Sequence, residues 1–169
     1  LKKKKLKKIK IQVVNTGLNS LTGLRIKKLQ KFVSTDNFFL TYGDGISNIN
    51  LGKLLKFHNK HKRIATISAV RPPARFGFIK LNQNKVRCFR EKSSLDEGWI
   101  NGGFMVLNKK IFKYLKGDET YLERYPLEKL SNNGQLYAFK HEGFWQCMDT
   151  LRDKVILEKN IRQKKHLGK

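Results

Sequence analysis

An apolar run that ends in a glycine-flanked aspartate constrains this chain more than any other feature. Phe38-Phe39-Leu40 leads into a turn in which Asp44 lies between Gly43 and Gly45. In open α/β folds ligands bind at the carboxyl ends of strands, and glycine lets the backbone approach a bulky group such as a phosphate. A carboxylate placed there can hold a divalent cation through its hard oxygen atoms. The alternative is a tight turn in which Asp44 only caps the backbone.

A second aspartate stands in the same kind of position. Asp149 follows the apolar segment 144–148 and precedes a helix, so it too lies at a strand-to-helix junction. Two carboxylates at one edge of a sheet could share a cation, and magnesium prefers such oxygen ligands. The alternative is that Asp149 is another cap.

Length and composition are those of a globular protein or part of one. The chain has 169 residues, of which 39% are hydrophobic and 11% aromatic, enough to bury a core in a single domain. No stretch approaches the roughly 20 apolar residues of a membrane span, and the first residues have no signal-peptide pattern. Cys88 and Cys147 lack metal-ligand or redox spacing. We therefore expect reduced thiols, a cytoplasmic location and no membrane partner.

The charge is strongly basic, with 37 Lys and Arg against 13 Asp and Glu and a net charge of +24. Residues 1–8 form a basic, linker-like segment, and residues 9–169 form one partial domain. After this segment the cations are scattered along the chain rather than gathered on one motif. Nucleic acid is therefore not expected as the main partner, although a basic, non-catalytic polyanion-binding module is an alternative.

Strands and helices alternate along the chain. Alternating or continuous apolar patterns predict strands at residues 9–13, 38–42, 64–70, 78–81, 85–89, 99–107, 136–139 and 144–148. Caps and helical spacing predict helices after Thr22, after Asn50, near 109–115, near 126–131, and after Thr150, which forms a capping box with Asp153. The pair 78–81 and 85–89 reads as a hairpin. This order indicates an α/β fold with a mixed sheet.

Three local features allow more than one interpretation. The pair Gly102-Gly103 inside a strand indicates either a bulge or the close approach of a ligand. Arg25 falls in a first helical turn, where a cation needs a nearby anion or full solvation. His58 and His61 are three residues apart on a helix without an acidic or cysteine partner, so surface histidines are favoured over metal ligands.

Seven strings of residues, in chain order, carry a family resemblance. They are Thr16-Gly17, Thr22-Gly23, Leu40-Thr41-Tyr42-Gly43-Asp44-Gly45, Arg75-Phe76-Gly77, Glu91-Lys92, Gly98-Trp99-Ile100-Asn101-Gly102-Gly103-Phe104 and Gly143-Phe144-Trp145-Gln146-Cys147-Met148-Asp149-Thr150-Leu151-Arg152-Asp153. Together they resemble the sugar-phosphate nucleotidyltransferases, and within them the branch that makes CDP-glucose from CTP and glucose 1-phosphate. The resemblance runs from about Val13 to Lys159. It implies a Rossmann-like mixed-sheet fold.

The resemblance also implies a role for each matching residue. Asp44 and Asp149 match the two magnesium-binding aspartates, and they are catalytic together with Lys92. The nucleotide-contacting positions are Ser20, Arg25 and Gly43, which would give the first-turn Arg25 its anion. The positions that bind the sugar phosphate are Gly77, Glu91, Lys92, Asn101, Gly102 and Gly103.

The resemblance implies a magnesium-dependent transfer of a cytidylyl group from CTP to glucose 1-phosphate, with pyrophosphate as the leaving group. A homo-oligomer is compatible with it. Another nucleotide or sugar phosphate is the nearest alternative.

The chain departs from the family pattern at three places. The family's Gly-rich loop would precede Ile9 and is not found in this sequence, so we expect the N-terminal part of the fold to be lacking. The chain alone should then be inactive, with an unpaired sheet edge and apolar surface exposed. Asn15 and Ser93 replace a usual aspartate and proline, and we treat both as tolerable.

Overall fold

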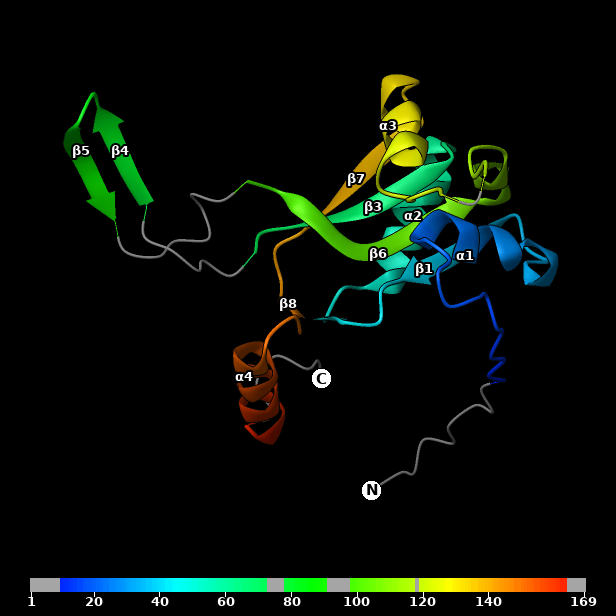
Figure 1. The fold of residues 1–169 in the computed structure, drawn as a ribbon, viewed down its shortest axis with the longest axis horizontal. Helices are drawn as coiled ribbons and strands as arrows, with labels where there is room; N and C mark the ends of the chain where they lie inside the picture. Colours follow the sequence, from blue (N-terminus) through cyan, green and yellow to red (C-terminus); the bar gives the residue numbers. More distant parts are fainter. Residues whose placement is uncertain (1–9, 73–77, 91–97, 118, 164–169) are drawn as a thin grey trace.

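The computed structural model describes residues 10–72, 78–90, 98–117 and 119–163. Its centre is a four-stranded sheet in the order β1-β6-β3-β7 (Figure 1). The strands are β1 Asn37–Thr41, β6 Ile100–Asn108, β3 Ala65–Val70 and β7 Leu136–His141. β6 is antiparallel to β1 and β3, whereas β7 is parallel to β3. The predicted α/β class with a mixed sheet is confirmed.

The topology collects several chain segments at one edge of this sheet. Because β1, β3 and β7 run in the same direction, their carboxyl ends meet where β6 begins. β1 leads into β2 Gly45–Ser47, and β7 leads into β8 Trp145–Cys147. β2 and β8 pair antiparallel with each other as a separate two-stranded sheet. The two turns that carry Asp44 and Asp149 are thereby brought to the same place.

The helices form where caps and apolar spacing allow them. They are α1 Thr22–Lys28, α2 Leu51–His61, α3 Tyr125–Asn132 and α4 Leu151–Arg162, with short 3-10 helices η1 Gln30–Phe32 and η2 Lys109–Lys113. The predicted cap of α2 is confirmed, because the Asn50 side chain accepts a hydrogen bond from the Lys53 N–H at 2.9 Å. The capping box of Thr150 and Asp153 at the start of α4 is confirmed as well.

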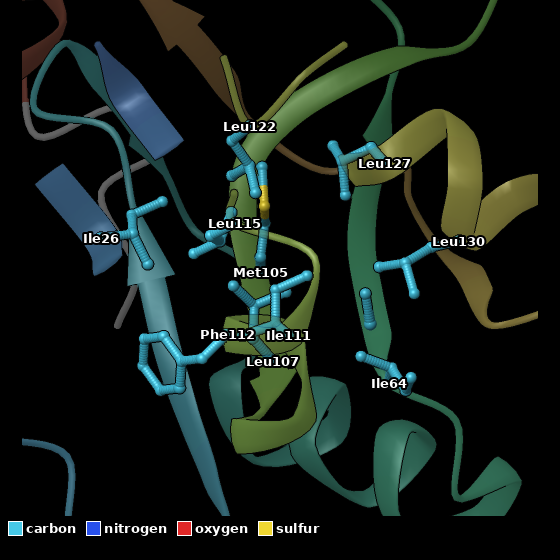
Figure 2. Packing of buried hydrophobic residues seen from close by; sticks show 11 residues of the cluster. Ile26, Ile64, Met105, Leu107, Ile111, Phe112, Leu115, Leu122, Leu127 and Leu130 are labelled. Atoms are coloured by element: carbon cyan, nitrogen blue, oxygen red, sulfur yellow. The ribbon is translucent and has the colours of Figure 1, made fainter. Parts of the chain in front are cut away.

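Both faces of the sheet carry buried side chains. Successive residues of β6 point alternately to the two faces, so β6 contributes to the packing on each. Met105 and Leu107 point into a cluster on one face (Figure 2), and Val106 points to the opposite face, where it meets Leu54 of α2. The buried members of the first cluster are Ile26, Ile64, Ala65, Met105, Leu107, Ile111, Phe112, Leu115, Leu122, Leu127 and Leu130. A sheet with helices on both faces is the layering expected of an α/β fold.

The predicted hairpin is also present. β4 Phe78–Asn82 pairs antiparallel with β5 Lys85–Arg90. Asn82 pairs with Lys85, so the turn consists of Gln83 and Asn84, and Gln83 has a positive φ of 49°. The hairpin forms its own two-stranded sheet, seen at the left of Figure 1.

Three local predictions were wrong. No strand forms over residues 10–14, where Ile11 and Val13 are 82% and 93% exposed, because an alternating pattern makes a strand only where a partner strand accepts it. The N-cap of α1 is Leu21 rather than Thr22. His58 is not a surface histidine, since it lies on the buried face of α2 and is only 1% exposed. The short helix predicted near 109–115 does form, as the 3-10 helix η2.

The expected exposed sheet edge is found at β1. This strand is the last in the sheet order, and Phe39 on it is 46% exposed. An apolar groove of about 300 Å³ runs beside it, lined in part by Phe32, Val33, Phe38 and Phe112. Within the described residues no helix is long and apolar enough to cross a membrane.

Candidate functional site

The two aspartates predicted to bind metal occupy neighbouring positions. Gly45 pairs with Cys147 in the β2–β8 ladder, and the Met148 N–H donates to the backbone carbonyl of Asp44 at 2.9 Å. Asp149 follows directly, at the start of α4. Its Oδ2 accepts a hydrogen bond from the Cys147 thiol at 3.1 Å. Residues 105 positions apart in the sequence therefore present two carboxylates at one end of a short ladder.

A cavity of about 550 Å³ opens beside the turn of Asp44. Its lining residues are Thr22, Tyr42, Gly43, Asp44 and Glu123. The Glu123 carboxylate accepts hydrogen bonds from the hydroxyl of Tyr42 and, at 2.8 Å, from that of Thr22. The Thr22 oxygen in turn accepts from the Leu122 N–H at 2.9 Å. The cavity wall is thus built from α1, the β1–β2 turn and the segment before α3.

Tyr42 is held in its neutral form at this wall. Partial burial raises the pKa of its hydroxyl above the usual value, and the hydrogen bond to the Glu123 carboxylate raises that pKa further. A hydroxyl that keeps its proton is a donor, so the bond to Glu123 is charge-assisted.

Asn101, Gly102 and Gly103, which are predicted to bind the sugar phosphate, form a bulge at the start of β6. The β3–β6 register shifts between Ile67 and Ala69, and Gly103 has a positive φ of 76°. The Asn101 side chain accepts from the Gly103 N–H at 3.0 Å. A Cβ on Gly102 would lie 2.7 Å from Val70, and one on Gly103 would lie 2.9 Å from the Tyr42 ring. The bulge interpretation is confirmed, and protein side chains account for the need for glycine.

The bulge is hydrogen-bonded to the segments that carry Asp44 and Asp149. The Trp145 indole N–H on β8 donates to the Gly102 carbonyl at 2.8 Å, and the Tyr42 N–H donates to the Gly103 carbonyl at 3.2 Å. Asn101–Gly103 therefore lie beside the segments that carry the aspartates. The structure brings these two predicted sets of residues together.

The predicted nucleotide residues are distributed over two cavities. Gly43 lines the cavity of Asp44, whereas Ser20 lines a second cavity of about 1120 Å³ between the loop before α1 and residues 116–125. Arg25 binds its own loop, donating to the Thr16 hydroxyl at 2.9 Å and to the Leu18 carbonyl at 3.0 Å. Arg25, a cation of α1, thus stabilises the loop that contains Ser20.

Three predicted residues, Gly77, Glu91 and Lys92, lie outside the described residues. No motif in the sequence marks Glu123 as a residue of the cavity wall. Glu123 lies 81 residues from Tyr42 and 101 from Thr22, so no local spacing marks it. Thr22 is predicted as a helix cap and belongs to the Thr22-Gly23 string, but neither feature marks it as a residue of this cavity. Long-range pairing of this kind is visible only in the fold.

Comparisons with known proteins identify the family of the chain. Residues 2–153 match the family described as Nucleotidyl transferase. The glucose-1-phosphate cytidylyltransferase of Salmonella typhimurium is 45% identical over 149 residues, which are 88% of this chain and 58% of that protein. A probable glucose-1-phosphate cytidylyltransferase of Bacillus subtilis is 37% identical over 161 residues, 95% of this chain and 63% of that protein.

A solved structure confirms the fold. HddC from Yersinia pseudotuberculosis superposes with a TM-score of 0.62 at 23% identity, over 83% of this chain and 62% of that one. The chain spans about three-fifths of the length of these two curated relatives. The family match over most of its residues, together with the paired aspartates and the glycine bulge, shows that the chain belongs to the nucleotidyl transferase family.

Proposed function

We propose that the chain supplies the acceptor-sugar half and both metal aspartates of an enzyme that transfers a cytidylyl group from CTP to glucose 1-phosphate. The products would be CDP-glucose and pyrophosphate. The observation that carries the proposal is the β2–β8 pairing, which sets Asp44 beside Asp149 in a chain 45% identical to a glucose-1-phosphate cytidylyltransferase. A cytoplasmic location and a homo-oligomer remain predictions of the same interpretation.

The residues present fit a divalent cation, which nucleotidyltransferases of this family generally use. Two carboxylates on neighbouring segments supply hard oxygen ligands, and magnesium typically binds one or two carboxylates plus substrate phosphates. Among the described residues no group of three His, Cys, Asp or Glu side chains could hold a metal. We propose that the pair of carboxylates Asp44 and Asp149 holds Mg²⁺, which would neutralise phosphate charge there.

The reaction asks the protein mainly for positioning and charge neutralisation. A phosphate oxygen of glucose 1-phosphate attacks the α-phosphorus of CTP, and the bond to the β-phosphate breaks. Ser20, Arg25 and Gly43 would contact the nucleotide. Asn101, Gly102 and Gly103, with Gly77 and Glu91, would form the sugar pocket, and Lys92 would offset the charge of the attacking phosphate.

The test is an assay of pyrophosphate release by a full-length protein that contains this chain, with glucose 1-phosphate and one of CTP, UTP or dTTP. We expect release with CTP. Asp44→Asn and Asp149→Asn should each reduce the rate by about 100-fold or more, a loss comparable to removing an electrostatic stabiliser of a transition state.

The matched control is Glu128→Gln in α3, which removes one carboxylate at a position outside the cavity of Asp44 and should leave the rate unchanged. Release with UTP or dTTP but not with CTP would contradict the cytidylyl assignment. Unchanged rates in both aspartate variants would contradict the metal site.

A further inference from the structure

The Glu123 carboxylate joins three parts of the candidate site that are distant in the sequence. It accepts from Thr22 on α1, and it accepts from the hydroxyl of Tyr42, two residues before Asp44. The ring of Tyr42 lies against Gly103 of the sugar-side bulge, and its N–H donates to the Gly103 carbonyl at 3.2 Å. Glu123 is thus linked to the nucleotide side, the metal turn and the sugar side of the site.

Among the described residues few contacts hold the turn between β1 and β2, and besides Glu123 the Asn101 side chain also hydrogen-bonds Tyr42. Gly43 and Asp44 are exposed, and a Cβ on Gly43 would meet nothing within 4 Å. The two backbone bonds nearest the turn are donated by Tyr42 and Met148. The turn is therefore fixed from one side by β8 and from the other through the Tyr42 side chain.

From these contacts we infer that Glu123 is a positioning residue, which holds Tyr42 and so fixes the place of the Asp44 carboxylate relative to the Gly103 bulge. It acts through Tyr42 and needs no contact with substrate. Only one part of the inference, the effect of Glu123 on cation binding, rests on the proposed function. The geometric part, that Glu123 immobilises the turn, stands on the hydrogen bonds alone.

Amide hydrogen exchange of the chain 1–169, measured by NMR without metal or nucleotide, tests the geometric part. In Glu123→Ala and in Tyr42→Phe, the amides of Tyr42 and Met148 should exchange about five- to tenfold faster, as expected for the loss of one charge-assisted hydrogen bond. In the double variant these amides should exchange only slightly faster than in the more affected single variant, because both changes remove the same hydrogen bond. The amides of Ala65 and Asn108, hydrogen-bonded at the far end of the sheet, should not change.

Binding of Mn²⁺, followed by electron paramagnetic resonance, tests the consequence. Glu123→Ala and Tyr42→Phe should each weaken binding about three- to tenfold, whereas Glu123→Gln, whose one remaining oxygen can still accept from the Tyr42 hydroxyl, should weaken it less than Glu123→Ala. If only the negative charge of Glu123 mattered, Glu123→Gln would reduce the Mn²⁺ affinity as much as Glu123→Ala, and Tyr42→Phe would not reduce it. Glu128→Ala is the charge-matched control.

The two arms separate the possible failures. Exchange that is unchanged at Tyr42 and Met148, or equally faster throughout the sheet, would overturn the positioning role. Absence of Mn²⁺ binding in the unaltered chain would instead contradict the proposed metal site, and the exchange result would still decide the role of Glu123. If Glu123→Ala does not fold, Tyr42→Phe tests the same bond without changing the charge.

Discussion

At the scale of single residues, His58 and His61 share one hydroxyl group. His58 Nδ1 lies 2.8 Å and His61 Nε2 lies 2.7 Å from the Thr66 oxygen. Since that oxygen carries one proton, it can donate to only one ring, and the other ring must donate to it. Because His61 Nδ1 accepts from the Arg63 N–H at 3.0 Å, His61 donates to the hydroxyl through Nε2, and the hydroxyl donates to His58 Nδ1, which must therefore be unprotonated. This arrangement fastens α2 to β3.

Acid should therefore weaken the fold through His58. Burial, with a smaller contribution from the nearby His61, lowers the pKa of His58 from 6.5 to about 4. The unfolded chain then binds the proton more readily than the folded chain, so stability is complete above about pH 6.5 and falls as the pH drops towards 4. The loss attributable to His58 should reach about 3 kcal/mol at most, from about 1.4 kcal/mol per pKa unit.

Urea unfolding at pH 7.5 and at pH 4.5 measures this loss. In His58→Leu the free energy of unfolding should differ less between the two pH values than it does in the unaltered chain. Carboxylates contribute equally to both proteins, so their contribution cancels in this comparison. An undiminished difference in the variant would show that other groups set the acid sensitivity.

At the scale of elements, α4 depends on its first residues. The Thr150 oxygen accepts from the Asp153 N–H at 3.2 Å, and Asp153 accepts from the Thr150 N–H at 3.0 Å and hydroxyl at 2.8 Å. Asp153 is only 6% exposed and also accepts from Gln146 on β8 at 3.2 Å. The capping box therefore joins the helix to the strand that precedes Asp149.

Removing this cap should be measurable as a loss of stability. Thr150→Ala is expected to lower the free energy of unfolding by about 1 kcal/mol, the usual cost of a lost N-cap side chain. Thr150→Ser retains the hydroxyl and serves as the control, with a change of less than half that size. Equal losses in the two variants, determined by urea titration, would show that the threonine methyl group and not the cap is responsible.

Elements marked by local chemistry were predictable from the sequence. The caps at Asn50 and Thr150 and the hairpin all depend on neighbours a few residues away, and the structure contains each of them. The strand expected at residues 9–13 was not, because pairing depends on a distant partner that the pattern cannot supply. The same reason explains the candidate site. Asp44 and Asp149 carry a motif each, whereas Glu123 enters only through contacts across the fold.

At the scale of the whole molecule, the basic charge does not single out a site. The cavity near Ser20 has three cations, Lys28, Lys116 and Arg124, among thirteen lining residues. Lys and Arg are 37 of the 169 residues of the chain, which is the same proportion. A cationic cavity is therefore what the composition alone would produce, and the net charge of +24 acts as a diffuse field.

A diffuse field and a polyanion-binding site differ in affinity at physiological salt. We expect binding of the chain to a short DNA duplex to be non-specific, with a dissociation constant of about 10⁻⁶ M or weaker near 150 mM salt. The double variant Asp44→Asn/Asp149→Asn raises the net charge by two and should bind DNA slightly more tightly, while it loses Mn²⁺. Nanomolar DNA binding at that salt concentration, measured by fluorescence anisotropy and retained in the double variant, would favour the polyanion-binding alternative. Weak DNA binding combined with loss of Mn²⁺ in the variant supports a cation site for phosphate chemistry, because only a localised pair of carboxylates makes the two ligands respond in opposite directions.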